Sequence, residues 1–336
     1  MDVRLSAEQK ALRDAAAQLI ERLGPTSVAA LADGERRDKL EAAVAGAGWR
    51  ELREADEDGA PYASAVEVAL VAEELSRGLA DVPFLGPVLA SELRRRAGID
   101  APSTLETVAL TAGLGALAAG TTVPAGALAV DAAGAASALL LIGDGGVPVL
   151  GRVAVAPLAT QQVDLTRATG LVATTAHGAG GAQLSADDLT RWAAFTTAVT
   201  SAELLGIIRG AVDATVAYAK TRKQYGTAIG SFQAVQHLLA DAHVLIEGSR
   251  SLVQHAAWAV DALDPAEAMT AAALAKAYTS RAARTVCETS IQVHGGIGNT
   301  WECLAHVYLR RAFLSIDVLG GANTHLRNVL SGYGVV

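Results

Sequence analysis

The sequence has 336 residues, of which 51% are hydrophobic and 18% are charged, and its formal net charge is −8. This length supports two or three structural units around a substantial core, and the composition excludes a disordered chain. The negative charge argues against general nucleic-acid binding, which needs a basic surface. An anionic ligand would therefore need local donors such as arginines, backbone amides or helix N-termini.

The mean hydropathy of +0.31 comes mainly from alanine. Charged residues, glycine or proline interrupt most of the apolar runs. The longest uncharged stretch, residues 107–130, is poor in large apolar side chains and is interpreted as buried strand and loop, not as a membrane span. The N-terminus lacks the apolar region of a signal peptide, which predicts a cytoplasmic protein. The two cysteines, Cys287 and Cys303, suit a reducing compartment, and no metal-ligand spacing surrounds them.

Residues 1–103 are predicted to form a helical domain. Ser6 and Gln9 fit a capping box, in which each side chain satisfies a free backbone amide of the other residue. Apolar residues at helical spacing follow as far as Gly24 and Pro25, which end this first helix. Further helices are predicted over residues 37–47, 62–79 and 87–97.

Residues 104–184 are predicted to form a shortened middle β domain, because charge nearly vanishes there while glycine, threonine and valine become common. The apolar runs 139–142 and 147–150 flank Gly143, Asp144, Gly145 and Gly146, a pattern typical of a hairpin. Further short strands are predicted over residues 153–155 and 170–175.

Residues 185–336 are predicted to form a four-helix domain. Capping and turn signals predict helices from Ser185 toward residue 221, after Ser231, from Asp264-Pro265 to about residue 293, and over residues 302–316 and 323–330. The chain therefore has an α+β pattern in which an N-terminal helical domain precedes a small β domain and a C-terminal four-helix bundle.

Two segments of the C-terminal half resemble segments of the acyl-CoA dehydrogenase family. Residues 221–233 carry Arg222, Tyr225 and Gln233, and they are similar to the family's R-x-x-F/Y-G-x-x-I-x-x-F/H-Q segment between two long helices. Residues 292–298 are similar to the family's later Q-x-x-G-G-x-G turn; they carry Gln292, Gly295, Gly296 and Gly298. The resemblance implies an acyl-CoA dehydrogenase-like fold and FAD as the cofactor.

The resemblance also implies that these residues complete an FAD site across a subunit contact. Arg222 offers a planar, permanently charged fork to pyrophosphate oxygens. Tyr225 packs beside the flavin–ribityl region, and Gln233 hydrogen-bonds the nucleotide part. The three glycines leave room for backbone amides to reach the cofactor. Taken singly, Arg222 also fits a cation at a helix end, and the glycine pair also fits an ordinary helix stop.

The sequence departs from the family at the catalytic base, a glutamate that removes the α-proton of the acyl-CoA while the β-hydrogen leaves as hydride. In residues 318–323 the matching position is Gly320, which cannot transfer a proton. A second family location falls near Thr196. Glu203 lies two turns further along that helix and is a substitute base or a structural glutamate paired with Arg209 or a partner chain.

The family's T-E-P-x-x-G-S-D stretch and its W-I-x-N strand, which hold the flavin, are not visible between residues 104 and 183. The chain therefore resembles the short companion subunit of heterotetrameric (α2β2) steroid-CoA dehydrogenases of bacterial steroid catabolism. The resemblance implies α,β-desaturation of a steroid-derived CoA thioester, a second acyl-CoA dehydrogenase subunit that supplies the glutamate, and an electron-transfer flavoprotein as electron acceptor. Two alternatives stay open: a homo-oligomeric enzyme that uses Glu203 as its base, and a flavin-free scaffold subunit.

Overall fold

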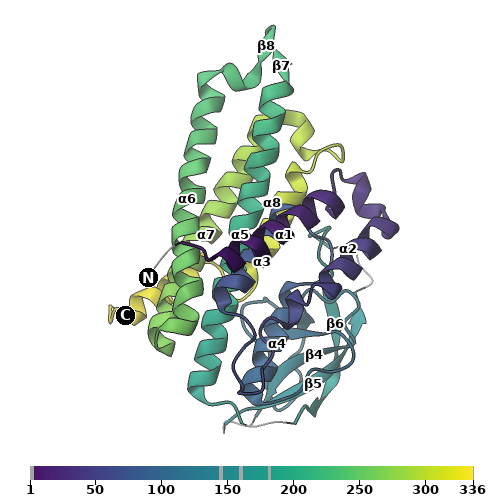
Figure 1. The fold of residues 1–336 in the computed structure, drawn as a ribbon, viewed down its shortest axis with the longest axis vertical. Coiled ribbons are helices and arrows are strands. Elements are labelled where there is room, and N and C mark those ends of the chain that lie inside the picture. Colours follow the sequence, from purple (N-terminus) through teal and green to yellow (C-terminus); the bar gives the residue numbers. More distant parts are fainter. Residues whose placement is uncertain (1–3, 144–146, 159–161, 181–182, 336) are drawn as a thin grey trace.

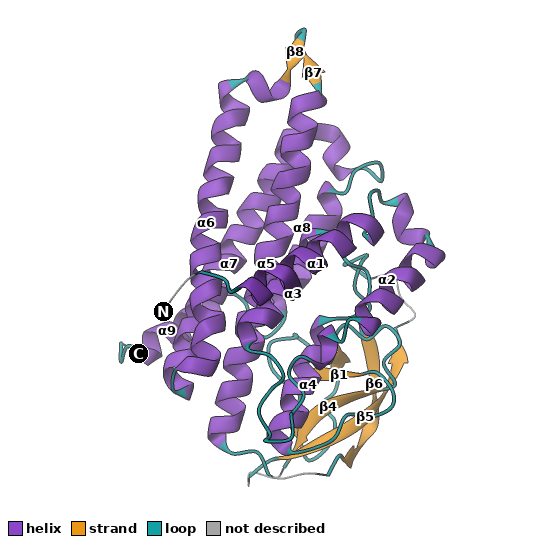
Figure 2. Cartoon of the chain, viewed as in Figure 1, coloured by secondary structure: helices purple, strands orange, loops and turns teal. Residues whose placement is uncertain are grey.

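The computed structural model describes residues 4–143, 147–158, 162–180 and 183–335. Figure 2 shows a mostly helical molecule with a small sheet beside the lower part of the helices and a short two-stranded hairpin at the upper end. The elements follow the order helices, strands, helices along the chain, so the predicted α+β fold is confirmed.

The N-terminal helices are α1 (Ala7–Leu23), α2 (Gly34–Gly46), α3 (Ala65–Arg77) and α4 (Leu85–Ala97). The capping box is present, because the Gln9 amide donates to the Ser6 hydroxyl at 3.1 Å and the Ser6 amide donates to the Gln9 side chain at 3.0 Å. Helix α3 begins three residues later than predicted, because Ser64 caps it and the Tyr62 amide donates instead to the Glu54 carbonyl.

The sheet closes on itself as a small barrel. Its strands are β1 (Glu106–Leu110), β2 (Ala119–Gly120), β3 (Leu128–Ala129), β4 (Ser137–Ile142), β5 (Val149–Pro157) and β6 (Gly170–Gly178). The strand order is β1-β3-β6-β5-β4-β2, and an additional parallel pairing of β1 with β4 closes the ring. Small apolar side chains fill one buried cluster of this barrel: Ala109, Ala118, Ala127, Ala129, Ala138, Leu140 and Val153.

The predicted hairpin is confirmed by the antiparallel pairing of β4 with β5, in which Leu141 lies opposite Leu150. Its turn includes residues 144–146, which lie outside the described residues. The two strands predicted over residues 147–150 and 153–155 are one continuous strand, β5.

The C-terminal helices are α5 (Ala186–Thr221), α6 (Gln233–Ala262), α7 (Pro265–His294), α8 (Ala305–Asp317) and α9 (Ala322–Gly332). Figure 1 shows α5, α6 and α7 side by side along the long axis of the molecule. Helix α5 has 36 residues, which corresponds to a length of about 54 Å. It contacts α3, α6, α7 and α8, so the other helices assemble around it. Within the described ranges, none of the helices has the length and apolar character needed to cross a bilayer.

A fully buried arginine joins the N-terminal helices to the bundle. Arg53 donates to Glu92 on α4 at 2.9 Å and to Asp261 on α6 at 3.0 Å. Its guanidinium carbon also lies 4.9 Å from the centre of the Phe195 ring on α5. The Asp261 carboxylate also accepts a hydrogen bond, at 2.6 Å, from the Ala65 amide at the start of α3.

Replacement of this arginine tests how much the buried contact stabilises the fold. We expect Arg53→Met to lower the free energy of unfolding by about 3 kcal/mol, because it removes the buried cation that bridges Glu92 and Asp261. Urea denaturation followed by circular dichroism measures this change. The control is Lys39→Met, which breaks the exposed pair with Glu35 and should leave the midpoint unchanged. Equal denaturation midpoints for the two variants would contradict a stabilising role for the buried Arg53 contact.

Candidate functional site

An exposed hairpin connects α5 to α6 at the upper end of the bundle (Figure 1). Its strands β7 (Lys223–Gln224) and β8 (Thr227–Ala228) pair antiparallel. The two turn residues, Tyr225 and Gly226, have φ angles of 51° and 81°, as expected for a two-residue hairpin turn. Tyr225 is 97% exposed, and its ring meets Phe232 edge-on with the ring centres 6.4 Å apart. The hairpin therefore presents a tyrosine ring at its tip.

Arg222 ends α5 at the base of this hairpin. Its amide donates to the Tyr218 carbonyl at 2.8 Å, and its carbonyl accepts from the Ile229 amide at 2.8 Å, so two hydrogen bonds fix its backbone. The side chain is exposed, and it has no ion-pair partner within the part of the chain that the structure describes. Its guanidinium is consequently available to phosphate or carboxylate oxygens of a ligand.

The N-terminus of α6 lies next to this arginine in the chain and adds free amides. The residue before the helix is Phe232, whose side chain cannot accept a hydrogen bond. The first amides of a helix have no intrahelical acceptors and carry partial positive charge, which favours anions. Gln233 is the first residue of α6, and its side chain is exposed beside these amides.

The second predicted segment forms a glycine turn after α7. Gly295 has φ 66° and ψ −145°, a conformation that only glycine adopts readily. Gly295 and Gly296 are exposed, and a Cβ added to either would meet no atom within 4 Å. Gly298 differs, because it is buried and a Cβ there would lie 3.0 Å from the Ile291 carbonyl. Its missing side chain serves the packing of the turn, whereas the pair before it faces open space together with exposed Gln292.

The two segments lie at the same end of the bundle. Ala219, Ile229 and Val293 form one buried apolar cluster that joins the end of α5, the hairpin and the end of α7. Tyr218 also stacks on His294 with the ring centres 4.5 Å apart. The structure thus brings both predicted segments together on a surface that the chain itself does not cover.

The loop between α8 and α9 carries the position that the resemblance gives to the catalytic base. Gly320 has φ 98°, and a Cβ there would lie 3.3 Å from His325 Nε2. The Leu319 amide donates to the Leu114 carbonyl at 2.7 Å, and the Leu319 carbonyl accepts from His325 Nε2 at 2.9 Å. These contacts fix a loop conformation that strains any side chain at position 320.

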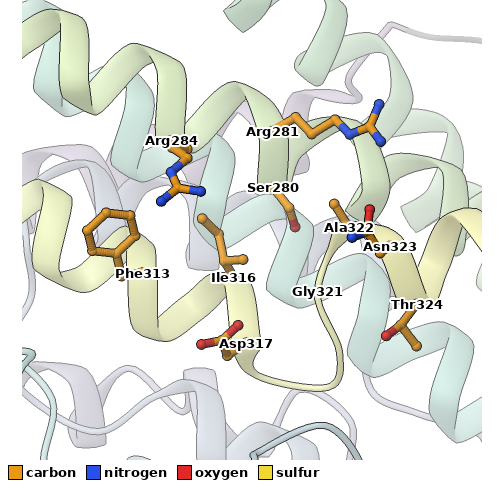
Figure 3. A pocket seen from close by; sticks show the side chains of 10 residues that line it. All are labelled: Ser280, Arg281, Arg284, Phe313, Ile316, Asp317, Gly321, Ala322, Asn323 and Thr324. Carbon is orange, nitrogen blue, oxygen red and sulfur yellow. The ribbon is translucent and has the colours of Figure 1, made fainter.

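A cavity of about 600 Å³ lies beside this loop, between α7, α8 and the start of α9. Figure 3 shows Arg284 directed toward Phe313, and the guanidinium carbon lies 5.5 Å from the ring centre. Arg281 and Asp317 also line the cavity, and Ser280 Oγ is buried there without a hydrogen-bond partner among the described residues. Two guanidinium groups make this lining better suited to a polar or anionic group than to an apolar chain.

Glu203, the substitute base that the sequence offered, is buried on α5 between two arginines. Its Oε1 accepts from Arg311 Nη2 at 3.0 Å and forms a shorter ion pair with Arg167. Both contacts are buried ion pairs, which hold the carboxylate in place by charge-assisted hydrogen bonds. The cavity that adjoins Glu203 is about 10 Å³, which is barely the space of one water molecule. This arrangement is that of a structural glutamate.

The predicted partner of Glu203 was wrong. Arg209 instead donates to Glu73 at 2.6 Å and to Glu74 at 2.7 Å, both on α3. Residues six apart on a helix do not share a face, whereas residues three or four apart do. That rule alone excludes the Glu203–Arg209 pair. The actual partner Arg167 lies in the loop between β5 and β6, and no local signal in the sequence predicts the contact.

Comparison with known proteins shows what the C-terminal half of the chain is similar to. Residues 172–332 match the family model for the acyl-CoA dehydrogenase C-terminal domain. Acyl-CoA dehydrogenase FadE34 of Mycobacterium tuberculosis is 44% identical over 131 residues, which are 39% of this chain and 18% of that protein. The chain therefore matches less than a fifth of the length of this relative.

The whole chain also resembles solved structures. It aligns with a chain of the ChsE4-ChsE5 complex from Mycobacterium tuberculosis with a TM-score of 0.81 and 23% identity, over 100% of both chains. It aligns with a chain of the Tcur3481-Tcur3483 steroid ACAD G363A variant with a TM-score of 0.80 and 22% identity, over 97% of this chain and 98% of that one. These likenesses confirm the predicted fold.

The environment of Glu203 leads to a test of its role. We expect Glu203→Gln to lower the free energy of unfolding by about 3 kcal/mol, because it removes the buried counter-charge that Arg167 and Arg311 share. Urea denaturation measures the loss. Glu247→Gln on α6, whose partner Arg250 is partly exposed, is the control and should unfold at the wild-type midpoint. A stable Glu203→Gln chain that no longer supports turnover would instead indicate a catalytic base.

Proposed function

Because residues 172–332 belong to the acyl-CoA dehydrogenase C-terminal domain family and the whole chain has the acyl-CoA dehydrogenase fold, we propose that the chain is one subunit of an FAD-dependent acyl-CoA dehydrogenase. In this proposal it completes an FAD site that a different subunit mostly houses. The observation that carries the proposal is the convergence of Arg222, the uncapped start of α6 and the Gly295–Gly296 turn on one uncovered end of the bundle.

These groups fit the nucleotide part of FAD. Arg222 and the first amides of α6 would hold phosphate oxygens, since both offer positive charge without an acceptor of their own. Gln233 and Gln292 would hydrogen-bond polar atoms of the nucleotide, and Tyr225 would pack against it. The glycine pair would let the backbone approach closely, because no side chain fills the space in front of it. When bound, FAD supplies the acceptor for the hydride that leaves the β-carbon of the thioester.

The α-proton of the thioester must go to a base, and this chain does not offer one at either family position. Gly320 has no side chain, and Thr196 is a buried residue whose hydroxyl donates to the Ala193 carbonyl at 3.1 Å. Glu203 is held between two guanidinium groups. We therefore infer that the partner subunit supplies the glutamate, and that the product is the α,β-unsaturated thioester.

The likeness to complexes of two differently named chains supports a heteromer as the working assembly. One of these, Tcur3481-Tcur3483, is described as a steroid ACAD, which supports a steroid-derived CoA thioester as the substrate class. We propose an α2β2 arrangement with a second acyl-CoA dehydrogenase subunit, and an electron-transfer flavoprotein as the electron acceptor.

The heteromer is tested by expressing the chain with and without its genomic neighbour from the same family. We expect the two together to purify as a yellow complex that bleaches when an acyl-CoA thioester is added. The chain alone should contain little FAD and should not oxidise the thioester. Stoichiometric FAD and thioester oxidation in the chain alone would overturn the heteromer.

The role of Arg222 is tested within the purified complex. We expect Arg222→Gln to weaken FAD binding roughly 10- to 100-fold, since charge-assisted hydrogen bonds contribute about 1.5–3 kcal/mol. Fluorescence titration of the flavin-depleted complex with FAD measures the dissociation constant. Lys220→Gln is the matched control, because it removes an exposed cation from the same turn of α5 and should leave FAD affinity unchanged. An equal loss of FAD affinity in both variants would show that Arg222 acts only through its general positive charge.

A further inference from the structure

The groups that the proposed FAD site brings together lie on two separate loops. Arg222 lies at the end of α5, whereas the Gly295–Gly296 turn follows α7, and both loops are exposed. One ligand binds tightly to both loops only when their spacing is fixed beforehand, because ordering them during binding costs free energy. The contact that fixes this spacing is therefore important for binding even if it does not reach the ligand.

An aromatic stack between Tyr218 and His294 joins the two helix ends. The ring centres are 4.5 Å apart, and the ring planes are inclined by 22°. Tyr218 lies one turn before Arg222 on α5, and its carbonyl accepts a hydrogen bond from the Arg222 amide at 2.8 Å. His294 is the last residue of α7 and directly precedes Gly295. The stack therefore connects the residue that fixes the Arg222 backbone to the residue at which the glycine turn begins.

The His294 side chain is held in one orientation and packs directly against the glycine turn. Its Nδ1 lies 2.7 Å from the Ser290 carbonyl oxygen, and since a carbonyl only accepts hydrogen bonds, Nδ1 donates. His294 is buried, and a Cβ added to Gly298 would lie 3.0 Å from the His294 Cβ. A movement of this residue consequently moves the turn.

Helices α5 and α7 are already fixed to each other below this stack. Thr215 Oγ1 on α5 and Ser290 Oγ on α7 lie 2.7 Å apart, and both residues are buried. Among the described elements, these two helices share the most extensive contact. The Tyr218–His294 stack adds little to it, because it lies near the ends of both helices. Loss of the stack should therefore leave the helices packed and change the alignment of the two loops.

We propose that Tyr218 and His294 are positioning residues, which hold Arg222 and the Gly295–Gly296 turn at the spacing that one ligand requires. The inference rests on the proposed function, in which that ligand is the nucleotide part of FAD. Neither ring has to touch the cofactor. Because the two loops are aligned as one unit, their contributions to FAD affinity are coupled and not additive.

The first experiment uses the full-length chain alone and measures amide hydrogen exchange by mass spectrometry. Tyr218→Leu removes the aromatic stack. We expect amide exchange to become roughly three- to tenfold faster in the hairpin and in the glycine turn, because stacked rings stabilise local structure to that extent. This measurement needs neither FAD nor a partner subunit, so it does not depend on the proposed function.

Two variants serve as controls for the exchange measurement. Tyr218→Phe keeps the ring and loses only a hydroxyl that bonds to none of the described residues, so exchange should stay at the wild-type rate. His255→Leu breaks a stack with Trp258 in the second half of α6 and should leave both loops unchanged. If Tyr218→Leu affects the hairpin but not the glycine turn, the proposal is overturned. Faster exchange throughout α5 and α7 also overturns it, because the stack would then hold the helices together.

The second experiment measures the binding of FAD to the flavin-depleted complex. We expect Tyr218→Leu to weaken FAD binding roughly three- to tenfold and Tyr218→Phe to retain wild-type affinity, since the ring alone makes the stack. His294→Phe, which also keeps a ring, should bind FAD more tightly than His294→Leu. When Arg222→Gln is already present, Tyr218→Leu should cause little further loss, because the two loops no longer share the ligand.

Two outcomes distinguish failure of this inference from failure of the proposed function. An equal loss of FAD affinity from Tyr218→Leu with and without Arg222 overturns the positioning role, because the ring would then act independently of that arginine. Wild-type FAD affinity in the Arg222→Gln complex contradicts the proposed function instead. The exchange measurements on the chain alone then decide whether the stack aligns the two loops.

Discussion

One buried carboxylate connects the three parts of this chain. Glu203 on α5 binds Arg311 on α8 and Arg167, which follows the barrel strand β5. Arg311 also donates to the Ala80 carbonyl between α3 and α4 at 2.6 Å. Two like charges can be buried together only when a counter-charge lies between them. The position of Glu203 between these two arginines is therefore a requirement of the fold.

This constraint leaves the far end of the bundle as the candidate site. Helix α5 is continuous from the sheet to Arg222, so the same rigid element that holds the buried ion cluster also positions the exposed hairpin. At that end the Arg222 side chain and the backbone of the glycine turn are exposed, because no other part of the chain covers them. A buried glutamate that organises the interior and an uncovered surface that needs a second molecule are consistent with a subunit that acts by completing a site.

The sequence predicted what local physical chemistry determines. The caps at Ser6, Ser185 and Asp264 set helix starts within a few residues, because side-chain oxygens satisfy free amides only at those positions. The closed barrel and the Arg167–Glu203 contact were missed, because both join residues that are far apart in the chain. The inward position of Gly298 was also missed, since a glycine in a turn serves packing or ligand approach equally well until its neighbours are known.

The absence of a base at position 320 is a property of the whole loop. Gly320 has a φ of 98°, and Leu319 is fixed by hydrogen bonds to Leu114 and His325. A glutamate introduced there would face backbone strain and would bring its Cβ to 3.3 Å from His325 Nε2. A single substitution would thus not place a working base at position 320, because the loop would have to change its conformation as well. This loop conformation therefore supports the proposal that another subunit supplies the base.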